Sequence, residues 1–324
     1  MNINTFINFF GGIGLFLFGM KLMSESIENR AGDKLKKILN KVTKNNYYGI
    51  AIGAGVTALI QSSSALTVLL VGFVNSGIIC FEQSIGLLMG SNIGTTITSW
   101  IVGLLDIHGT GLILTLLNPR FFTPLFAIIG ASILIFSINK QKHSIANIII
   151  GFSILMYGIL IMSDVMKPLA NNEYFRSILT AFNNPLISFT AGILFTAVIQ
   201  SSSASIGVLQ TLTVTGGITY RIAIPIILGL NIGTCITALI SSIGVNINAK
   251  KVAYAHLLFN VLGSVFAFTV YFLIMLVIQN KLNTIITSAN IAIVHTLFNV
   301  STTILLLPFT KQLTKIINKT IKEK

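Results

Sequence analysis

The sequence predicts an all-α polytopic membrane protein, and three observations carry this prediction: few charges, long apolar runs and an internal duplication. Of the 324 residues, 53% are hydrophobic and 9% are charged, and the mean hydropathy is +0.87. A soluble domain has about 25% charged residues, so this chain could not cover a water-facing surface. Its long Ile-, Leu-, Val- and Phe-rich runs exclude the short alternating strands of an outer-membrane barrel.

Nine apolar segments supply the predicted helices, because about 20 apolar residues are needed for a helix to cross a bilayer. The segments are residues 5–26, 47–79, 84–105, 121–138, 144–166, 186–219, 222–246, 252–279 and 285–308. In 47–79 and 186–219, two arms of about 14 residues flank a Gln-Ser-Ser-Ser sequence. Arms of that length suit a re-entrant helical hairpin whose tip reaches the middle of the membrane; two complete crossings are the alternative.

The two hairpin segments belong to an internal duplication with an offset of 139 residues. The sequence QSSSA at 61–65 recurs at 200–204, and NIGTT at 92–96 recurs as NIGTC at 231–235. Between residues 51 and 101, 21 of 51 positions are identical to the residue 139 positions later. The sequence therefore predicts a single transmembrane domain, divided as follows: domain 1–324, repeat 1 at 5–140, repeat 2 at 144–280, final span at 285–308 and basic tail at 311–324.

The distribution of basic residues predicts how the chain lies in the membrane. If the loop at 30–44 is cytoplasmic, the segments on its side hold 15 basic residues and the opposite side holds 5. This split follows the positive-inside rule and places the C-terminus in the cytoplasm. It also puts the duplicated loops 30–44 and 167–184 on opposite faces, so the repeats are predicted to be inverted. Inverted repeats are typical of secondary transporters, whose site lies at the midplane between them.

The net charge of +13 is explained by a membrane rather than by nucleic acid. The Lys and Arg residues lie between apolar segments, where they face an anionic leaflet, so no nucleic-acid partner is expected. Segment 30–44 has a helical spacing of apolar residues. We expect this segment and the tail at 311–324 to lie against anionic lipid. The two cysteines, Cys80 and Cys235, form no metal-ligand pattern.

The two Gln-Ser-Ser-Ser sequences are the first candidates for a ligand site. Each offers one amide and three hydroxyls, and burying such groups unpaired is costly. A chain break would also free N–H groups that suit an oxyanion and carbonyls that suit a hard cation such as Na⁺. Packing of small residues is the alternative. The candidate anion-binding residues are Gln61, Ser62, Ser63, Ser64, Gln200, Ser201, Ser202 and Ser203.

The Asn-Ile-Gly-Thr sequences predict a broken helix in the middle of segments 84–105 and 222–246. Gly90 and Gly94 flank or enter the motif in the first copy, with glycines at the matching positions of the second. Such glycines invite a helix break, whose neutral oxygens would suit Na⁺; a packing kink is the alternative. The candidate sodium ligands are Asn92, Thr95, Thr96, Asn231 and Thr234.

A third pair of sequences, HLLFN at 256–260 and HTLFN at 295–299, lies in the second half of the chain. His and Asn four residues apart share a helix face. Interhelical hydrogen bonds are the favoured interpretation, and direct substrate contact or proton coupling is the alternative. These side chains are expected around the site rather than within it: His256, Asn260, His295 and Asn299.

No enzymatic activity is expected from this sequence. It has no Gly-x-Ser-x-Gly elbow for a serine nucleophile and no Gly-rich phosphate loop with a lysine, so ATP-driven transport by this chain alone is also disfavoured. Lys21 and Glu25, four residues apart, predict a structural ion pair. No arginine falls inside a predicted span, so a bound anion would need co-bound cations and dipoles to neutralise it. Cation coupling is the expected consequence.

Together these motifs resemble the type II sodium–phosphate cotransporter family, in its bacterial branch. The resemblance rests on the paired QSSSA and NIGT sequences, on AHLLFN at 255–260, on GLFLFGMKLMSE at 14–25 and on AVIQSSSASIGVLQ at 197–210. It implies a multi-pass protein of the bacterial inner membrane that moves inorganic phosphate with Na⁺, using both QSSS tips and no other cofactor. Many bacterial relatives continue into a cytoplasmic PhoU-like domain, whereas this sequence ends in a Lys-rich tail. A short member of the family and a truncated chain both stay open, so regulation through such a domain is not part of the expectation.

The sequence leaves several functions open beside sodium-coupled phosphate transport. A passive anion channel or a phosphate exporter would use the same lined path, and Na⁺-coupled transport of another oxyanion, such as sulfate, would need the same groups. The oligomeric state is also open, and a homodimer is one candidate.

Overall fold

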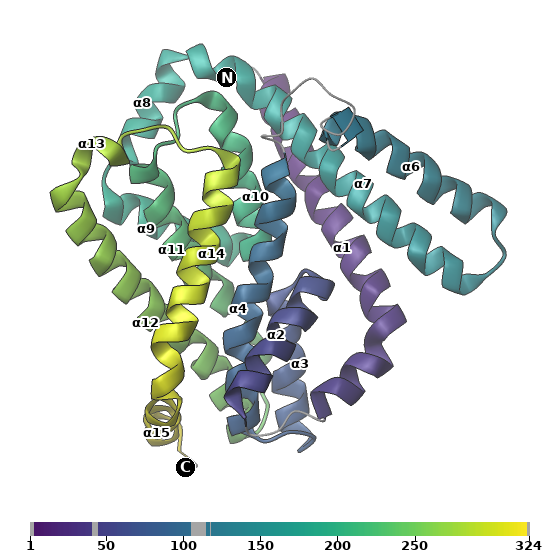
Figure 1. Cartoon of the computed structure of the whole chain (residues 1–324), viewed down its shortest axis with the longest axis vertical. Helices are drawn as coiled ribbons and strands as arrows, with labels where there is room; N and C mark the ends of the chain where they lie inside the picture. Colours follow the sequence, from purple (N-terminus) through teal and green to yellow (C-terminus); the bar gives the residue numbers. More distant parts are fainter. Residues whose placement is uncertain (1–2, 41–44, 105–114, 117, 323–324) are drawn as a thin grey trace.

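In a computed structural model, residues 3–40, 45–104, 115–116 and 118–322 are described, and among them every regular element is helical (Figure 1). The longer helices are α1 (Ile3–Asn40), α4 (Phe81–Gly103), α6 (Pro119–Phe136), α7 (Lys140–Met166), α11 (Tyr220–Ser241), α12 (Ile247–Val277) and α14 (Ser288–Leu306). The shorter helices are α2 (Asn46–Ile60), α3 (Ser63–Asn75), α8 (Glu173–Ala181), α9 (Pro185–Ile199), α10 (Ser202–Leu212), α13 (Gln279–Leu282) and α15 (Thr310–Thr320). Short 3-10 turns cover Lys167–Asn171, Thr213–Thr215 and Leu307–Phe309.

Seven of the described helices are long and apolar enough to cross a membrane, which confirms the predicted all-α polytopic class. The helices beside each QSSS sequence are shorter, with 15 residues in α2 and 13 in α3. At 1.5 Å per residue each is roughly 20 Å long, against about 30 Å of hydrocarbon. Figure 1 shows α2 and α3 in the lower half of the molecule and α9 and α10 in the upper half, so the two pairs approach each other from opposite ends.

The helices around the QSSS and NIGT sequences recur in the second half of the chain at a constant offset. Both bounds of α9 lie 139 residues after those of α2, and α10 and α11 begin at the same offset from α3 and α4. The glycines that follow α3 and α10, Gly77 and Gly216, both have positive φ, at 72° and 64°. The sequence repeat is therefore also a repeat of local structure. We call the half that contains α1 to α6 unit 1 and the half that contains α7 to α12 unit 2.

Helices α1 and α7 cross where glycines leave no side chain between them. A Cβ added to Gly19 would lie 2.5 Å from the Gly151 carbonyl oxygen, and one added to Gly158 would lie 2.6 Å from the Gly12 carbonyl oxygen. Gly12 and Gly19 occupy the repeat positions of Gly151 and Gly158, so each unit contributes the same two residues. Reciprocal contact of equivalent residues is what a two-fold axis between two copies produces. The crossing of α1 and α7 thus joins the units symmetrically.

The predicted helix break at the NIGT sequences is wrong, because α4 and α11 run unbroken through both motifs. The glycines serve close packing instead. A Cβ on Gly90 would lie 2.1 Å from the Ile50 carbonyl oxygen, and a Cβ on Gly229 would lie 2.1 Å from the Phe189 carbonyl oxygen. Backbone therefore rests on backbone where α2 meets α4 and where α9 meets α11, a use of small residues that is common between membrane helices.

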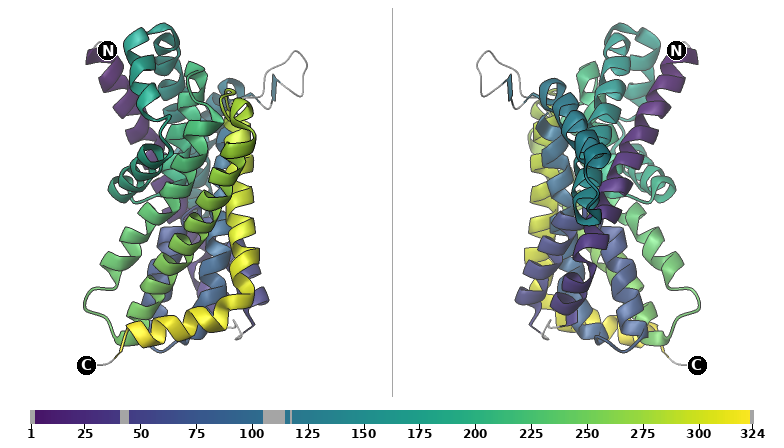
Figure 2. Two further views of the ribbon diagram at one scale, coloured as in Figure 1. Left: turned by 90° about the vertical axis from the view of Figure 1, so that its left-hand side faces the viewer. Right: turned by 90° about the vertical axis from the view of Figure 1, so that its right-hand side faces the viewer.

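The C-terminal helix α15 turns away from α14 and lies across the lower end of the molecule (Figure 2). Leu313 and Ile317 are buried in a cluster with apolar side chains of α12. Lys311, Lys315 and Lys319 are exposed on the other side of the helix. An amphipathic helix with a basic face suits the surface of an anionic membrane, and lipid contact by this tail stays a prediction.

The acidic side chains at matched repeat positions form ion pairs. Lys21 Nζ lies 3.7 Å from Glu25 Oε1, as the sequence predicts. Asp164, the repeat counterpart of Glu25, pairs with Arg120 and with Lys167, whose Nζ lies 3.1 Å away. The side chains of 31–40 and all of 41–44 lie outside the described part of the chain, so the expected lipid contact of segment 30–44 falls there.

The substitution Gly53→Ala is expected to destabilise the fold by about 1–3 kcal/mol. Its Cβ would lie 2.2 Å from the Leu87 carbonyl oxygen, which belongs to the backbone of α4. The matched control is Gly55→Ala on the same helix, where nothing lies within 4 Å of an added Cβ. That change should be neutral or slightly stabilising. Unfolding temperatures of the two purified variants in detergent measure the difference, and equal temperatures would contradict the packing of α2 on α4.

Candidate functional site

Each hairpin tip is built on a glutamine in the left-handed backbone region. Gln61 has φ 60° and Gln200 has φ 61°, and no other non-glycine residue in the described part of the chain has a positive φ. The backbone N–H of each glutamine donates to the carbonyl four residues earlier, of Thr57 at 2.7 Å and of Thr196 at 2.6 Å. Glycine usually fills such a helix end, because a Cβ is disfavoured there. Because glutamine occupies this strained position in both copies of the motif, we infer that its side chain is functional.

The first serine of each motif caps the helix that follows. Ser62 Oγ accepts a hydrogen bond from the Ala65 backbone N–H at 3.1 Å, and Ser201 Oγ accepts one from the Ala204 N–H at 3.2 Å. Both serines have extended backbone, as N-cap residues do. The chain therefore reverses through two residues, a glutamine and a serine, with the same geometry in both units.

Three of the later serines are buried residues, and the fourth contacts the other tip. Ser63, Ser202 and Ser203 are 4%, 4% and 3% exposed, and their hydroxyls have no hydrogen-bond partner among the described residues. Ser64 Oγ donates to the carbonyl oxygen of Gln200 at 3.2 Å, so a side chain of one tip binds the backbone of the other. The structure thus joins the two QSSS tips through Ser64 and Gln200, which lie 136 positions apart in the chain.

The meeting of two tips combines two kinds of neutral group. The first turns of α3 and α10 carry backbone N–H groups at the positive end of a helix, which attract anions. The last turns of α2 and α9 carry carbonyls at the negative end, which attract cations. The side chains of the two motifs add hydroxyls and amides but no charge. Hydrogen bonds and dipoles, rather than ion pairs, are the chemistry that this place offers.

The asparagines of the NIGT sequences lie in contacts between helices. Asn92 Nδ2 donates to Asn260 Oδ1 at 2.9 Å, and Asn231 Nδ2 donates to Asn299 Oδ1 at 2.7 Å. The threonine hydroxyls donate to carbonyls of their own helix. All five candidate sodium ligands are therefore buried, and their donors are used within the protein. Their oxygens retain lone pairs that could accept a cation.

The two His-x-x-x-Asn pairs support this arrangement from α12 and α14. Asn260 Nδ2 also donates to the His256 carbonyl at 2.9 Å, and Asn299 Nδ2 donates to the His295 carbonyl at 2.8 Å. His295 Nδ1 lies 3.3 Å from Ser99 Oγ. The structure therefore shows the interhelical hydrogen bonds that were the favoured interpretation, with each asparagine joined to a NIGT asparagine on a neighbouring helix.

Thr98 is a residue of the first tip that the sequence analysis missed. Its hydroxyl donates to Gln61 Oε1 at 2.7 Å. Thr237 occupies the equivalent position in unit 2, and its hydroxyl is buried without a partner among the described residues. The repeat held the signal, because threonine at both positions is one of the identities between the halves. A single copy would show only a threonine inside a helix.

Gln210 is a second residue that the sequence analysis missed. Its side chain is fully buried, and its Nε2 donates to the carbonyls of Ser99 at 2.8 Å and Ser288 at 2.9 Å. It thereby ties α10 to the end of α4 and the start of α14. Its repeat counterpart is Val71, so the duplication could not have revealed it.

A cavity of about 630 Å³ lies elsewhere, between α1, α7, α8, α9, α10 and α11. Its lining is apolar except for Ser205 and contains no residue of either QSSS sequence. Such a wall offers nothing to an ion, because moving an ion away from water without polar partners is very costly.

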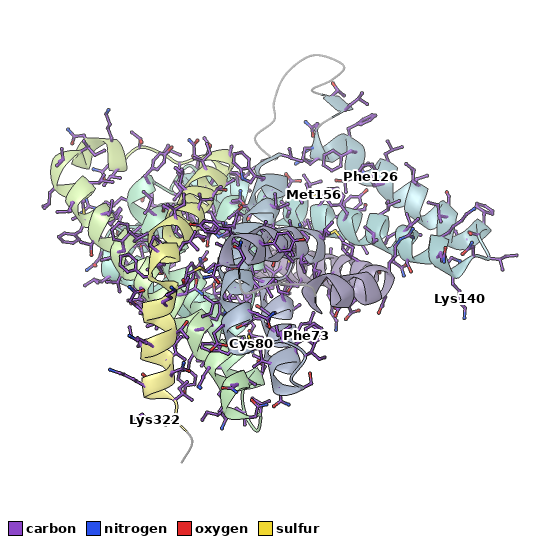
Figure 3. The ribbon with its side chains drawn as sticks, turned by 60° about the horizontal axis from the view of Figure 1, so that its bottom comes forward. Phe73, Cys80, Phe126, Lys140, Met156 and Lys322 are labelled. Carbon is purple, nitrogen blue, oxygen red and sulfur yellow. The ribbon has the colours of Figure 1, made fainter. Side chains whose placement is uncertain are left out.

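Figure 3 shows the side chains around the unit 1 hairpin, including Phe73 and Cys80. It also shows those of the α6–α7 pair, including Phe126 and Met156.

Comparisons with known proteins agree with a duplicated transporter. The model of the Na⁺/Pi-cotransporter family matches residues 15–164 and again 154–287. "Uncharacterized protein YqeW" of Bacillus subtilis (strain 168) is 31% identical over 259 residues, which are 79% of this chain and 80% of that protein. "Putative inorganic phosphate export protein YjbB" of Escherichia coli (strain K12) is 22% identical over 261 residues, which are 80% of this chain and 46% of that protein.

A shorter match joins the chain to an animal protein. "Sodium-dependent phosphate transport protein 2A" of Rattus norvegicus is 36% identical over 100 residues, which are 30% of this chain and 15% of that protein. No solved structure matches the chain. The two matches of the family model cover most of the chain, and the similarity to YqeW extends over four fifths of both proteins. The chain therefore belongs to the Na⁺/Pi-cotransporter family.

Proposed function

We propose that the chain is a sodium-coupled secondary transporter of inorganic phosphate, with the anion held between the two QSSS tips. The contact of Ser64 with Gln200 carries this proposal, because it joins the two copies of the motif at one place. The family and the relative named for sodium-dependent phosphate transport support the choice of ions. The family is a family of transporters, which is not a class of enzymes.

Phosphate suits the tips because it accepts many hydrogen bonds and carries negative charge. The hydroxyls of Ser63, Ser202 and Ser203 have no partner in the described structure and would donate to its oxygens. The N-terminal ends of α3 and α10 would add backbone N–H groups and a favourable dipole. A hydrogen bond to a charged group contributes about 1.5–3 kcal/mol, so a few of them suffice for specific binding.

Sodium is proposed as the coupling ion because the tips contain no positive side chain. An anion in a poorly solvated place is very costly unless an opposite charge lies near it. The carbonyls at the ends of α2 and α9 would offer the oxygen ligands that Na⁺ prefers, with oxygens of Asn92, Thr95, Thr96, Asn231 and Thr234 as further candidates. Na⁺ and phosphate would then each strengthen the binding of the other, and this coupling must be reciprocal.

Transport would follow from the opposite orientation of the two units. We propose that the hairpins enter from opposite faces of a bacterial inner membrane, so that the site opens to one face at a time. The basic segments at the α6–α7 turn and in the tail, whose Lys140 and Lys322 are labelled in Figure 3, would face the cytoplasm. The observed positions of the two hairpins in opposite halves of the molecule support this orientation.

Phosphate export, or passive passage, is the second candidate function. It is favoured by one observation, the similarity over four fifths of this chain to a protein named for phosphate export. The same tips would bind the anion in that case, and the difference would lie in the driving force.

Purified protein in proteoliposomes is expected to accumulate radiolabelled phosphate above equilibrium only when an inward Na⁺ gradient is present. Uptake should vanish when choline replaces Na⁺ at the same ionic strength, because the neutral tips then lack a compensating charge. Sulfate in excess tests selectivity by competition. Equal flux with and without the Na⁺ gradient would reject cotransport and favour the channel or export alternative.

The structure distinguishes the serines of each motif, so their alanine variants should differ. Ser63→Ala and Ser202→Ala are expected to weaken phosphate binding by about ten- to a hundredfold, because each removes a free hydroxyl at the tips. Ser62→Ala removes a helix cap and should lower stability by about 1 kcal/mol. The control is Ser76→Ala, at the other end of α3 and away from the tips, which should leave phosphate affinity unchanged. Calorimetric titration with phosphate in saturating Na⁺ measures affinity, and normal affinity in both free-serine variants would remove the tips from the site.

Single cysteines introduced at Asn171 and Lys319 are expected to lie on opposite faces of the membrane. In a Cys80→Ser/Cys235→Thr background, an impermeant thiol reagent added to intact cells should label residue 171 and leave residue 319 unlabelled until the cells are opened. The expectation follows from the charge asymmetry between the two ends. Labelling of 319 from outside with 171 protected would invert the proposed orientation.

A further inference from the structure

The glutamines of the two tips share a backbone conformation but hold their side chains differently. In unit 1 the Gln61 carboxamide is docked on its own unit: its oxygen accepts from the Thr98 hydroxyl at 2.7 Å, and its nitrogen donates to the Ala58 carbonyl at 2.5 Å. In unit 2 the Gln200 side chain is exposed and has no hydrogen-bond partner in the described part of the chain. The Thr237 hydroxyl, which would be its partner by symmetry, is buried and unpaired there.

The contact between the tips is asymmetric in the same sense. Ser64 of unit 1 donates to the Gln200 carbonyl oxygen at 3.2 Å. The symmetric bond would run from Ser203 to the Gln61 carbonyl, and it is not made: the Ser203 hydroxyl has no partner among the residues that the structure describes. The docked glutamine and the donating serine therefore both belong to unit 1.

The main-chain scaffold around Thr237 matches that around Thr98. A Cβ on Gly94 would lie 2.4 Å from the Ala54 carbonyl oxygen, and a Cβ on Gly233 would lie 2.4 Å from the Ile193 carbonyl oxygen. Each hairpin arm thus packs in the same register on its long helix, and the two glutamines have φ and ψ within a few degrees of each other. Rotation of the Gln200 side chain would bring its carboxamide to Thr237, as in unit 1.

We propose that Gln61–Thr98 and Gln200–Thr237 form an alternating latch. One tip has its glutamine docked on the long helix of its own unit while the other has its glutamine free, and the tips exchange these states in each transport cycle. Thr98 and Thr237 are then positioning residues that hold a carboxamide away from the ligand. The inference rests on the proposed function, because it assigns the docked and free tips to the two states of a transporter.

The energetics of the unpaired threonine support the latch. A buried hydroxyl without a partner costs free energy, and such groups are rare in folded proteins. Thr237 recovers its bond when Gln200 docks, and Thr98 loses its bond when Gln61 is released. Because the same kinds of group are exchanged, the two states differ by only a small free energy, which favours the described state in the absence of phosphate. A ligand with a modest preference for one state can therefore shift the balance between them.

Hydrogen–deuterium exchange of the full chain in lipid nanodiscs, without phosphate, tests the latch directly. In the wild type, the backbone of 58–66 at the docked tip should exchange more slowly than that of 197–205 at the free tip. Thr98→Val weakens the described state, so exchange should rise at 58–66 and fall at 197–205. Thr237→Val weakens the opposite state, so exchange should fall at 58–66. Each change should be roughly two- to tenfold, the effect of one hydrogen bond.

The effect of each substitution on the other tip is the decisive observation. Thr98→Ser and Thr237→Ser keep the hydroxyl and should exchange like the wild type. Gln200→Leu removes the carboxamide that would bind Thr237 in the opposite state, so its exchange pattern should match that of Thr237→Val. Because Gln200 is exposed, this variant remains available if Thr237→Val does not fold. Exchange changes confined to the substituted unit, or no change at 58–66 in both Thr237→Val and Gln200→Leu, would overturn the latch.

The two proposals can fail separately, because the exchange measurement needs no substrate. If wild-type protein carries no phosphate but the threonine variants still act on the opposite tip, the latch stands and the proposed substrate is wrong. If phosphate uptake depends on Na⁺ while each variant affects only its own tip, the transporter stands and the latch is rejected.

Discussion

The structure depends on how a backbone can reverse direction inside an apolar protein. Every N–H and C=O group that leaves a helix there needs a partner, because hydrocarbon provides no water. At each QSSS tip the glutamine N–H bonds back to the preceding helix, and the first serine caps the next one. Two residues thus complete the turn, and the hairpin arms can be too short to cross a bilayer. The remaining serines are left for contact with the other tip or with a ligand.

Glycine-mediated packing fixes the position of each hairpin tip on its long helix. Each hairpin arm rests on its long helix backbone to backbone, and the same kind of contact joins α1 to α7 across the pseudo-symmetry axis. Contacts this short allow one register only, because a slip of one residue would place a side chain against a carbonyl. The glycines therefore transmit the symmetry of the sequence to the position of the tips. They also explain why the NIGT helices remain unbroken.

A symmetric backbone with asymmetric side chains is well suited to a machine with two states. Gln61 and Gln200 have the same conformation, yet only one is docked, so the difference between the units lies in a few neutral hydrogen bonds. None of these bonds involves a charged side chain, and their net free energies are small. An ion pair in the same place would strongly favour one state. With neutral hydrogen bonds, the bound ions can determine which state is more populated, which fits a family named for the cotransport of phosphate and sodium.

The amino-acid sequence by itself determined the class, the duplication and the candidate site. Composition and segment length predicted a polytopic helical protein, and the offset of the repeat predicted that QSSS at 61–64 and 200–203 would be equivalent. These features are local or periodic, so they can be recognised in one dimension. The helix break predicted from the glycines of the NIGT sequences was wrong. A glycine that breaks a helix and a glycine that lets a neighbouring backbone approach give the same sequence pattern. Only the tertiary structure decided that Thr98 binds Gln61 while Thr237 stays unpaired. The two threonines are equivalent in the repeat, so the difference depends on side-chain distances that no sequence pattern contains.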